Sequence, residues 1–177
     1  MENLKLTPFQ PSGFATFISW LDNEELLFQI AGRYFTFPLT DDQLRNYLAD
    51  GKSIAFNVLA LDKIVGHAEI ILLGDGRVKL DKIIIGDPSM RGKGLGGQLI
   101  EALLNYAFSG LQATGVELLV FDWNMAGIKC YEKAGFTFVE QEMPPMEVGG
   151  KRWGVKKMQI DKSQFCQHSQ SDTKFPF

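Results

Sequence analysis

Hydrophobic positions in the first third of the chain recur at the spacing of amphipathic helices, with polar capping residues between them. Asp22 with Glu25, and Thr40 with Gln43, each have the spacing of a capping box at a helix N-terminus. Ser12 precedes a shorter apolar segment, and a glycine follows each of the two later segments. The pattern predicts three helices, over residues 12–20, 22–32 and 40–51.

The middle of the chain changes to apolar runs that short turns interrupt. The turns are Asp62-Lys63 and Gly74-Asp75-Gly76. Connections this short join antiparallel strands, because a parallel pair needs a crossover of about a dozen residues or more. We therefore expect an antiparallel meander of three strands, over Ile54–Leu61, Ile64–Leu73 and Val78–Ile85.

From Leu95 onwards the helical spacing returns, and further strands alternate with a short helix that Gly135 ends. The segment Met143-Pro144-Pro145-Met146 is expected to stay outside any β-ladder, because proline lacks an amide donor. The remaining elements are predicted over Val116–Phe121, Ala126–Ala134, Phe136–Gln141 and Trp153–Ile160.

Together these elements predict one domain of mixed α/β structure over residues 1–162, built around a strand–helix–strand unit. A chain of 177 residues is long enough to bury a sizeable core in one domain. The polar segment 163–177 lacks periodicity and is expected to be a loose C-terminal tail, from which Phe175 and Phe177 are able to dock on the domain.

Composition and charge exclude several classes of protein. The net charge is −3, so the chain lacks the basic footprint of a general nucleic-acid binder. No apolar run approaches the roughly 20 residues of a membrane helix. Two cysteines are too few for a disulfide scaffold, so a cytoplasmic protein with reduced thiols is expected. No HExxH, CxxC or GxSxG motif is present, which argues against a metal hydrolase and predicts no metal site.

The segment after Ile85 carries the strongest chemical signal. Pro88 follows the strand, and Arg91-Gly92-Lys93-Gly94-Leu95-Gly96-Gly97 then opens the amphipathic helix. Unpaired amides at a helix N-terminus, close backbone approach at glycines and two cations together favour binding of an anion, and a pyrophosphate fits best.

Three kinds of phosphate loop compete for this segment. Gly92, Gly94 and Gly97 satisfy G-x-G-x-x-G, and Asp122 ends the next strand, as in a dinucleotide-binding oxidoreductase. That fingerprint follows its strand almost immediately, however, and a strand meander does not suit a doubly wound sheet. A Walker A loop needs Lys-Ser/Thr after its last glycine, whereas Leu95 follows Gly94 here.

The third pattern fits, because Arg91-Gly92-Lys93-Gly94-Leu95-Gly96 resembles the R/Q-x-x-G-x-G/A signature of the GNAT superfamily of acetyl-CoA-dependent N-acetyltransferases. A second match runs from Asn124 through Tyr131-Glu132-Lys133 to Gly135-Phe136. The resemblance covers about residues 64–138 and implies a mixed, mostly antiparallel sheet of about six to seven strands. Helices flank this sheet in the family, and its two central strands splay apart.

The resemblance implies that acetyl-CoA lies in the gap between the splayed strands, paired like an extra strand. Carried over, the main chain of Ile83, Ile84 and Ile85 would bind the pantetheine arm, and the Ile85 amide would polarise the thioester carbonyl. Asn124 would contact the arm or act as an ordinary helix cap. The pyrophosphate would be wrapped by the amides of Arg91, Gly92, Lys93, Gly94, Leu95 and Gly96.

Tyr131 takes the position of the family's general acid, which protonates the departing thiolate. The base that deprotonates the acceptor amine is ambiguous. Asp81 and Glu69 lie on neighbouring strands, either of them able to face the cleft or solvent, and Asp122 is a weaker third possibility.

The acceptor is expected to contact the N-terminal helices and the loop before the last strand. Acidic and aromatic side chains there suit a cationic amine, although Glu24 and Glu25 equally suit a helix N-terminus. The other residues in this group are Trp20, Phe28, Tyr34, Phe35, Phe37, Met143 and Met146.

The leading hypothesis is an N-acetyltransferase that acts on a primary amine of a small molecule or a protein N-terminus, by direct attack in a ternary complex. The alternative is a non-catalytic acyl-CoA-binding or sensing module of the same fold. Family members often pair through sheet edges, so a homodimer is possible.

Overall fold

The computed structural model describes residues 4–171, with side chains through residue 167. Its central sheet has seven strands in the order β1-β2-β3-β4-β5-β9-β6, and only β4 and β5 pair in parallel. This confirms the predicted mixed, mostly antiparallel sheet. The strands are β1 (Lys5–Pro8), β2 (Ser53–Ala60), β3 (Lys63–Leu72), β4 (Arg77–Ile85), β5 (Gly115–Phe121), β9 (Val155–Asp161) and β6 (Thr137–Phe138).

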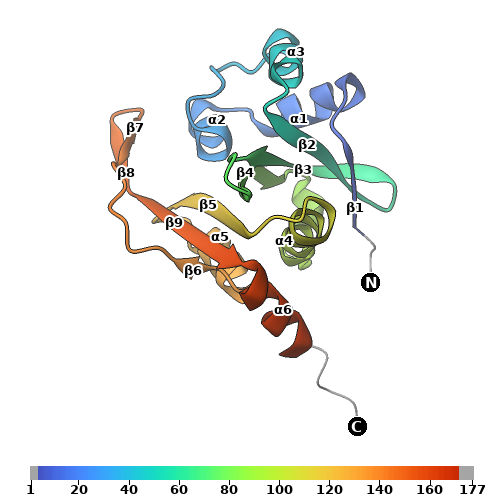
Figure 1. The fold of residues 1–177 in the computed structure, drawn as a ribbon. Helices are drawn as coiled ribbons and strands as arrows, with labels where there is room; N and C mark the ends of the chain where they lie inside the picture. Colours follow the sequence, from blue (N-terminus) through green and yellow to red (C-terminus); the bar gives the residue numbers. More distant parts are fainter. Residues whose placement is uncertain (1–3, 172–177) are drawn as a thin grey trace.

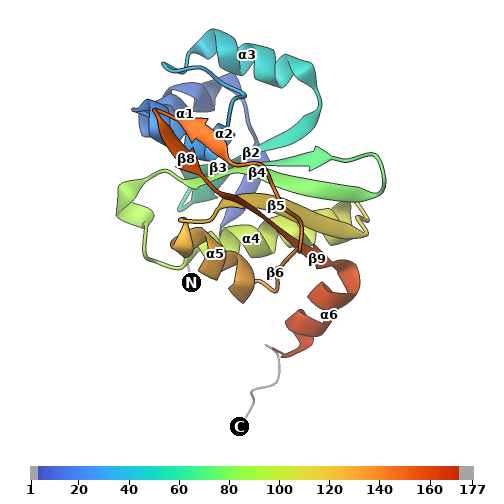
Figure 2. The same cartoon turned by 90° about the vertical axis from the view of Figure 1, so that its left-hand side faces the viewer.

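Helices cover both faces of the sheet (Figures 1 and 2). A 3-10 turn (Pro11–Gly13), α1 (Phe14–Trp20), α2 (Glu24–Ala31) and α3 (Asp41–Asp50) lie on one face. The opposite face carries α4 (Leu95–Asn105), which continues into a π-helical turn over Tyr106–Gly110, and α5 (Met125–Lys133). The last helix, α6 (Lys162–Ser171), follows β9.

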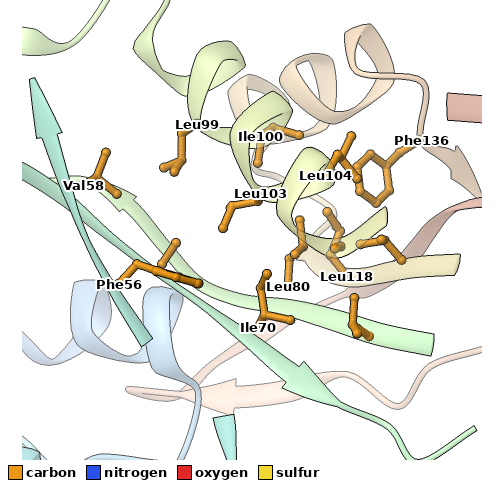
Figure 3. Packing of buried hydrophobic residues seen from close by; sticks show 14 of the residues in the cluster. Phe56, Val58, Ile70, Leu80, Leu99, Ile100, Leu103, Leu104, Leu118 and Phe136 are labelled. Atoms are coloured by element: carbon orange, nitrogen blue, oxygen red, sulfur yellow. The ribbon is translucent and has the colours of Figure 1, made fainter. Parts of the chain in front are cut away.

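The sheet separates two hydrophobic clusters. The larger one packs α4 against the strands, with Leu99 and Leu103 fully buried over Ile70, Leu80 and Leu118 (Figure 3). The smaller cluster joins the N-terminal helices to the opposite face of the sheet and is rich in aromatic rings. Because both faces are covered, the central strands are buried on both sides.

The helix boundaries follow local capping chemistry, with one correction. The N-cap of α2 is Asn23 and not Asp22, because the extended backbone at Asn23 lets its side chain accept the Leu26 amide at 2.9 Å. Thr40 caps α3 as predicted, by accepting the Gln43 amide at 3.4 Å. Ser12 caps nothing, since it lies within the 3-10 turn, and α1 starts at Phe14 without a side-chain cap.

The C-terminal third departs furthest from the predicted elements. The strand expected over Phe136–Gln141 is paired only at Thr137–Phe138. Residues around the two prolines form a hairpin of β7 (Met146–Val148) and β8 (Lys151–Trp153), in which Met146 pairs with Trp153. Met146 was therefore wrongly placed outside any ladder: the restriction on proline does not extend to the residue after it.

The expected loose tail is partly helical. Helix α6 reaches Ser171, and its Phe165 ring stacks on Phe108 at 5.1 Å between centroids. The prediction failed because one aromatic contact anchors a helix whose other side chains are mostly polar. Phe175 and Phe177, which were expected to be able to dock, lie outside the described residues. No helix within residues 4–171 is long and apolar enough to cross a membrane.

The parallel strands β4 and β5 pair over only part of their length. Their register runs from Arg77 opposite Gly115 to Leu80 opposite Leu118, and no pair follows within these two strands. At the same level the β3–β4 register shifts between His67 and Glu69, and Lys82 adopts a left-handed backbone with φ of 47°. This bulge turns β4 away from β5, which confirms the predicted splay.

Candidate active site

A cavity of about 300 Å³ lies where β4 and β5 separate. Both strands, the C-terminal half of α2, the N-cap and last turn of α5, and the β7 and β9 strands contribute to its wall. The lining comprises residues 28–33, 79–83 and 118–121, with Asn124, Tyr131, Met146 and Val155. The cavity therefore extends from the gap between β4 and β5 to the N-terminal helices.

Tyr131 reaches this cavity from α5, whose C-terminus is set by the tight turn at Gly135 with φ of 97°. Its ring is partly buried and lies 6.0 Å from the Phe136 ring. Burial, followed by the nearby Cys130 and Asp81, raises the pKa of the phenol above its ordinary value of 10.0. The hydroxyl therefore keeps its proton at neutral pH and is able to donate it.

Asn124 lines the same cavity and caps α5. Its Oδ1 accepts the Gly127 amide at 3.1 Å. The capping role that the sequence left open is thus present, and the side chain still borders the cavity.

The two carboxylates suggested as the base occupy different environments. Asp81 lines the cavity, with the Lys79 ammonium 2.9 Å from its Oδ2 and the Lys82 amide 2.9 Å from its Oδ1. Glu69 is buried, and does not line the cavity. The Lys82 ammonium and the hydroxyls of Tyr47 and Ser53 donate to Glu69. Asp122 is exposed and also outside the lining.

The three isoleucines at the end of β4 divide between the two hydrophobic clusters. Ile83 lines the cavity, whereas the Ile84 side chain is buried in the N-terminal cluster. Ile83 and Ile85 both pack against the larger cluster, but Ile85 does not reach the cavity lining. The structure brings Ile83, Asp81, Asn124 and Tyr131 together in one wall.

The glycine-rich segment forms the turn between β4 and α4. Asp87 begins the turn by accepting the amide and hydroxyl of Ser89 at 2.9 and 2.7 Å, and these bonds lower the pKa of its carboxyl. Gly92 and Gly94 have φ of 74° and 78°, a backbone that side chains rarely adopt. Gly94 is also the N-cap of α4 and provides no capping side chain.

The glycine turn leaves its outer surface open. A Cβ at Gly92 or Gly94 would meet no atom within 4 Å, whereas Gly96 lies against the Cys130 sulfur. The Arg91 guanidinium donates back to the carbonyls of Ile85 and Gly86, both at 3.3 Å. The first amides of α4 therefore face an open turn with the Arg91 and Lys93 cations on it, which is an arrangement that suits a bound anion.

The residues associated with the acceptor separate into two groups. Phe28 and Met146 line the cavity, but Glu25 forms a salt bridge with Lys151 at 2.6 Å, outside the lining. Trp20 packs on Gly86, where a Cβ would overlap the indole. The other residues of this group do not line the cavity: Glu24, Tyr34, Phe35, Phe37 and Met143. Two of them, Tyr34 and Phe35, border a second hollow beside α3.

Sequence reasoning missed three cations of the cavity wall, namely Arg33, Lys79 and Lys82. For Lys82 a partial signal was available: Val78, Leu80 and Ile84 are buried at alternate positions of β4, and Lys82 shares their parity. The parity does not give its direction, because Val78 and Leu80 pack in the larger cluster and Ile84 in the smaller one. Arg33 follows a helix-ending glycine, and nothing in its local sequence indicates a cavity.

Comparisons with known proteins show which family the chain resembles. A model of the acetyltransferase (GNAT) family matches residues 20–136. An N-acetyltransferase 9-like protein from Nematostella vectensis is 23% identical over 149 residues, which cover 77% of this chain and 75% of that protein. The spermine/spermidine N(1)-acetyltransferase of Bacillus subtilis is 34% identical over 64 residues, or 36% of this chain and 41% of the relative.

Solved structures share the fold. Spermidine N-acetyltransferase from Vibrio cholerae, in complex with CoA and spermine, superposes with a TM-score of 0.78 at 22% identity, covering 92% of this chain and 98% of that one. The aminoglycoside acetyltransferase AAC(6′)-Ib in complex with coenzyme A has a TM-score of 0.68 at 19% identity, covering 93% and 98%.

Because the family model spans well over half of the chain, this protein belongs to the GNAT acetyltransferase family. It is an acyltransferase, which confirms the predicted class of enzyme.

Proposed function

We propose that this enzyme transfers the acetyl group of acetyl-CoA to a primary amine by direct attack within a ternary complex. The observation that carries the proposal is the convergence of the β4–β5 splay, Tyr131 and Asp81 on one cavity, with the glycine turn at the end of the same strand. The relatives named for polyamines and aminoglycosides support an amine as the acceptor class.

The residues present suit CoA. The open turn at Gly92 and Gly94 and the uncapped N-terminus of α4 suit a pyrophosphate. Unpaired backbone edges beyond Leu80 and Leu118 suit an extended arm that bonds like a strand. When bound, CoA supplies the acetyl group as a thioester. Ile83 borders the cavity and Ile85 does not, so we assign the amide nearest the thioester carbonyl to Ile83.

The acceptor enters as an ammonium ion and has to lose a proton before its nitrogen can attack. We assign this step to Asp81, directly or through water, because its carboxylate borders the cavity. Glu69 is the weaker choice, since three donors already occupy it away from the cavity. The proton leaves to solvent, and the neutral amine forms a carbon–nitrogen bond with the acetyl carbon.

The carbon–sulfur bond breaks as the amide forms, and Tyr131 donates its proton to the departing thiolate. The second proton of the attacking nitrogen restores the phenol, so one turnover releases one proton in total. A covalent acyl-enzyme is not required. Burial raises the pKa of the Cys130 thiol, which leaves this neighbour of Tyr131 a poor nucleophile at neutral pH.

The test combines Tyr131→Phe with Asp81→Asn, using Tyr106→Phe as a matched control outside the cavity. We expect Tyr131→Phe to lower kcat about 100-fold or more, the usual scale for losing a general acid. Asp81→Asn should lower kcat at pH 7 and recover as rising pH deprotonates the amine. Free-thiol release measures turnover, and calorimetry measures CoA binding, which should stay within about twofold in each variant.

Tyr106 lies on the π-helical turn and packs against Phe56, so its variant should retain full turnover. Unchanged turnover in Tyr131→Phe would remove the assigned acid, and absence of CoA binding by the unmodified enzyme would remove the whole proposal.

A further inference from the structure

The cavity wall carries more positive than negative groups. Arg33, Lys79 and Lys82 line it, whereas Asp81 is its only carboxylate within the described residues. Lys82 is neutralised by the buried Glu69 behind it, and Lys79 lies 2.9 Å from Asp81. Arg33 has no ion pair or side-chain hydrogen bond to any residue that the structure describes, so its guanidinium is available to a ligand.

The acidic residues that suggested a cationic acceptor do not compensate for this charge. Glu24 and Glu25 lie outside the lining, and Glu25 is held by Lys151 at 2.6 Å. A polyamine with several ammonium groups would meet one shared carboxylate and an unpaired arginine. Like charges in a confined space oppose binding, so this cavity selects against a polycation.

Much of the remaining wall is apolar or aromatic. Phe28 of α2, the helix that ends just before Arg33, stacks on Phe121 at 6.1 Å between centroids. Trp153, which lies outside the lining, supports both rings edge-on, at 5.8 and 4.9 Å. Such a wall binds an apolar body by burying its surface, and at about 300 Å³ the cavity suits a small molecule.

We propose that the acceptor is a small amine that carries a carboxylate beside the nitrogen and an apolar side chain, as an apolar α-amino acid does. Arg33 would bind the carboxylate through its planar fork, and the amine would face Asp81. This inference rests on the proposed acetyl transfer and deepens it by naming the acceptor class. The bond changes are those given above, with the α-nitrogen as the attacking atom.

The experiment compares acceptors that differ only in the carboxylate. L-phenylalanine and phenethylamine form one pair, leucine and isopentylamine a second, and spermidine is the polycationic reference. Free-thiol release gives kcat/KM for each. We expect the carboxylate to raise kcat/KM at least about tenfold in both pairs, which corresponds to about 1.4 kcal/mol, and spermidine to be the poorest acceptor.

Variants of Arg33 then assign the preference to this side chain. Arg33→Glu should abolish or reverse the carboxylate preference, and Arg33→Lys should keep part of it. Arg152→Glu makes the same charge change at an exposed arginine of the neighbouring hairpin, outside the lining, and should leave the ratio unchanged. Equal use of phenylalanine and phenethylamine, or an unaltered ratio in Arg33→Glu, overturns the inference.

Calorimetry of L-phenylalanine with the enzyme–CoA complex separates this inference from the proposed reaction. Binding that depends on Arg33, without thiol release from any amine, would contradict acetyl transfer and still support the site. Turnover with amines that lack a carboxylate, without Arg33-dependent binding, would support acetyl transfer and contradict the acceptor class. Neither binding nor turnover would overturn both.

Discussion

His67 lies fully buried on β3, between the rings of Phe9 and Phe17 at 4.5 and 4.3 Å. Neither of its ring nitrogens has a hydrogen-bond partner among the residues that the structure describes. Burial, with a smaller contribution from the Lys82 ammonium, lowers its pKa from 6.5 to about 3. The imidazole is therefore neutral in the folded protein at every pH near neutrality.

This histidine should make stability depend on pH. In the unfolded state the imidazole binds a proton below pH 6.5, whereas in the folded state it does so only near pH 3. The contribution of neutral His67 to stability is therefore fully present above pH 6.5 and is lost as the pH falls towards 3. His67→Leu should remove about 1.4 kcal/mol per pH unit from the slope of unfolding free energy between pH 6 and 4. Urea unfolding across this range measures it, and an identical slope in both proteins would refute the assignment.

At the scale of elements, the turn into α4 places a conformational demand on glycine. Gly94 has φ of 78°, whereas Gly97, in the first turn of α4, has no such backbone and has open space around it. Gly94→Ala should cost about 1–2 kcal/mol of stability and weaken CoA binding. Gly97→Ala, the matched control, should raise stability by about 0.5–1 kcal/mol, because alanine is the better helix former.

Thermal unfolding and calorimetric titration with CoA measure both glycine variants. Equal effects of the two substitutions would show that the left-handed backbone at Gly94 does not matter to the turn.

Most element boundaries were accessible to local reasoning. Thr40 caps α3 and Gly51 ends it in a left-handed backbone, and the strand meander falls within a residue of the predicted ranges. Strand β1, the β7–β8 hairpin and α6 were not predicted, because each is short and depends on pairing or packing with distant residues. The bulge at Lys82 leaves no periodic signal either, since one left-handed residue alters the register and not the composition.

At the scale of the whole molecule, a buried polar cluster joins the sheet to the N-terminal helices. Lys82 of β4 and Glu69 of β3 are both almost completely buried, and the Tyr47 hydroxyl of α3 donates to the same carboxylate. The Lys82 ammonium also lies 4.4 Å from the Tyr34 ring centroid and 5.3 Å from that of Tyr47. Burial and the negative charge of Glu69 raise the pKa of the Tyr47 phenol.

Removing one partner of the buried Lys82–Glu69 ion pair should destabilise the folded protein. Lys82→Met leaves an uncompensated buried carboxylate and should lower the free energy of unfolding by about 3–5 kcal/mol. Adding Glu69→Gln removes that charge while keeping an acceptor for Tyr47 and Ser53, so the double variant should recover most of the loss. Denaturant unfolding of the two single variants and the double variant gives a double-mutant cycle. If the two changes in unfolding free energy simply added in the double variant, the coupling would be contradicted.

The sequence by itself determined the caps, the antiparallel meander and the glycine turn, because these depend on residues close together in the chain. It also indicated the family and predicted Tyr131 as a site residue, since both motifs are local, and the structure places Tyr131 in the cavity wall. Only the tertiary structure decided which side chains share the cavity: Asp81 borders it and Glu69 does not, although both lie on neighbouring strands. The position of Arg33 likewise depends on how α2 packs over the splay, and packing between distant segments follows from burial of the whole chain and not from any single segment.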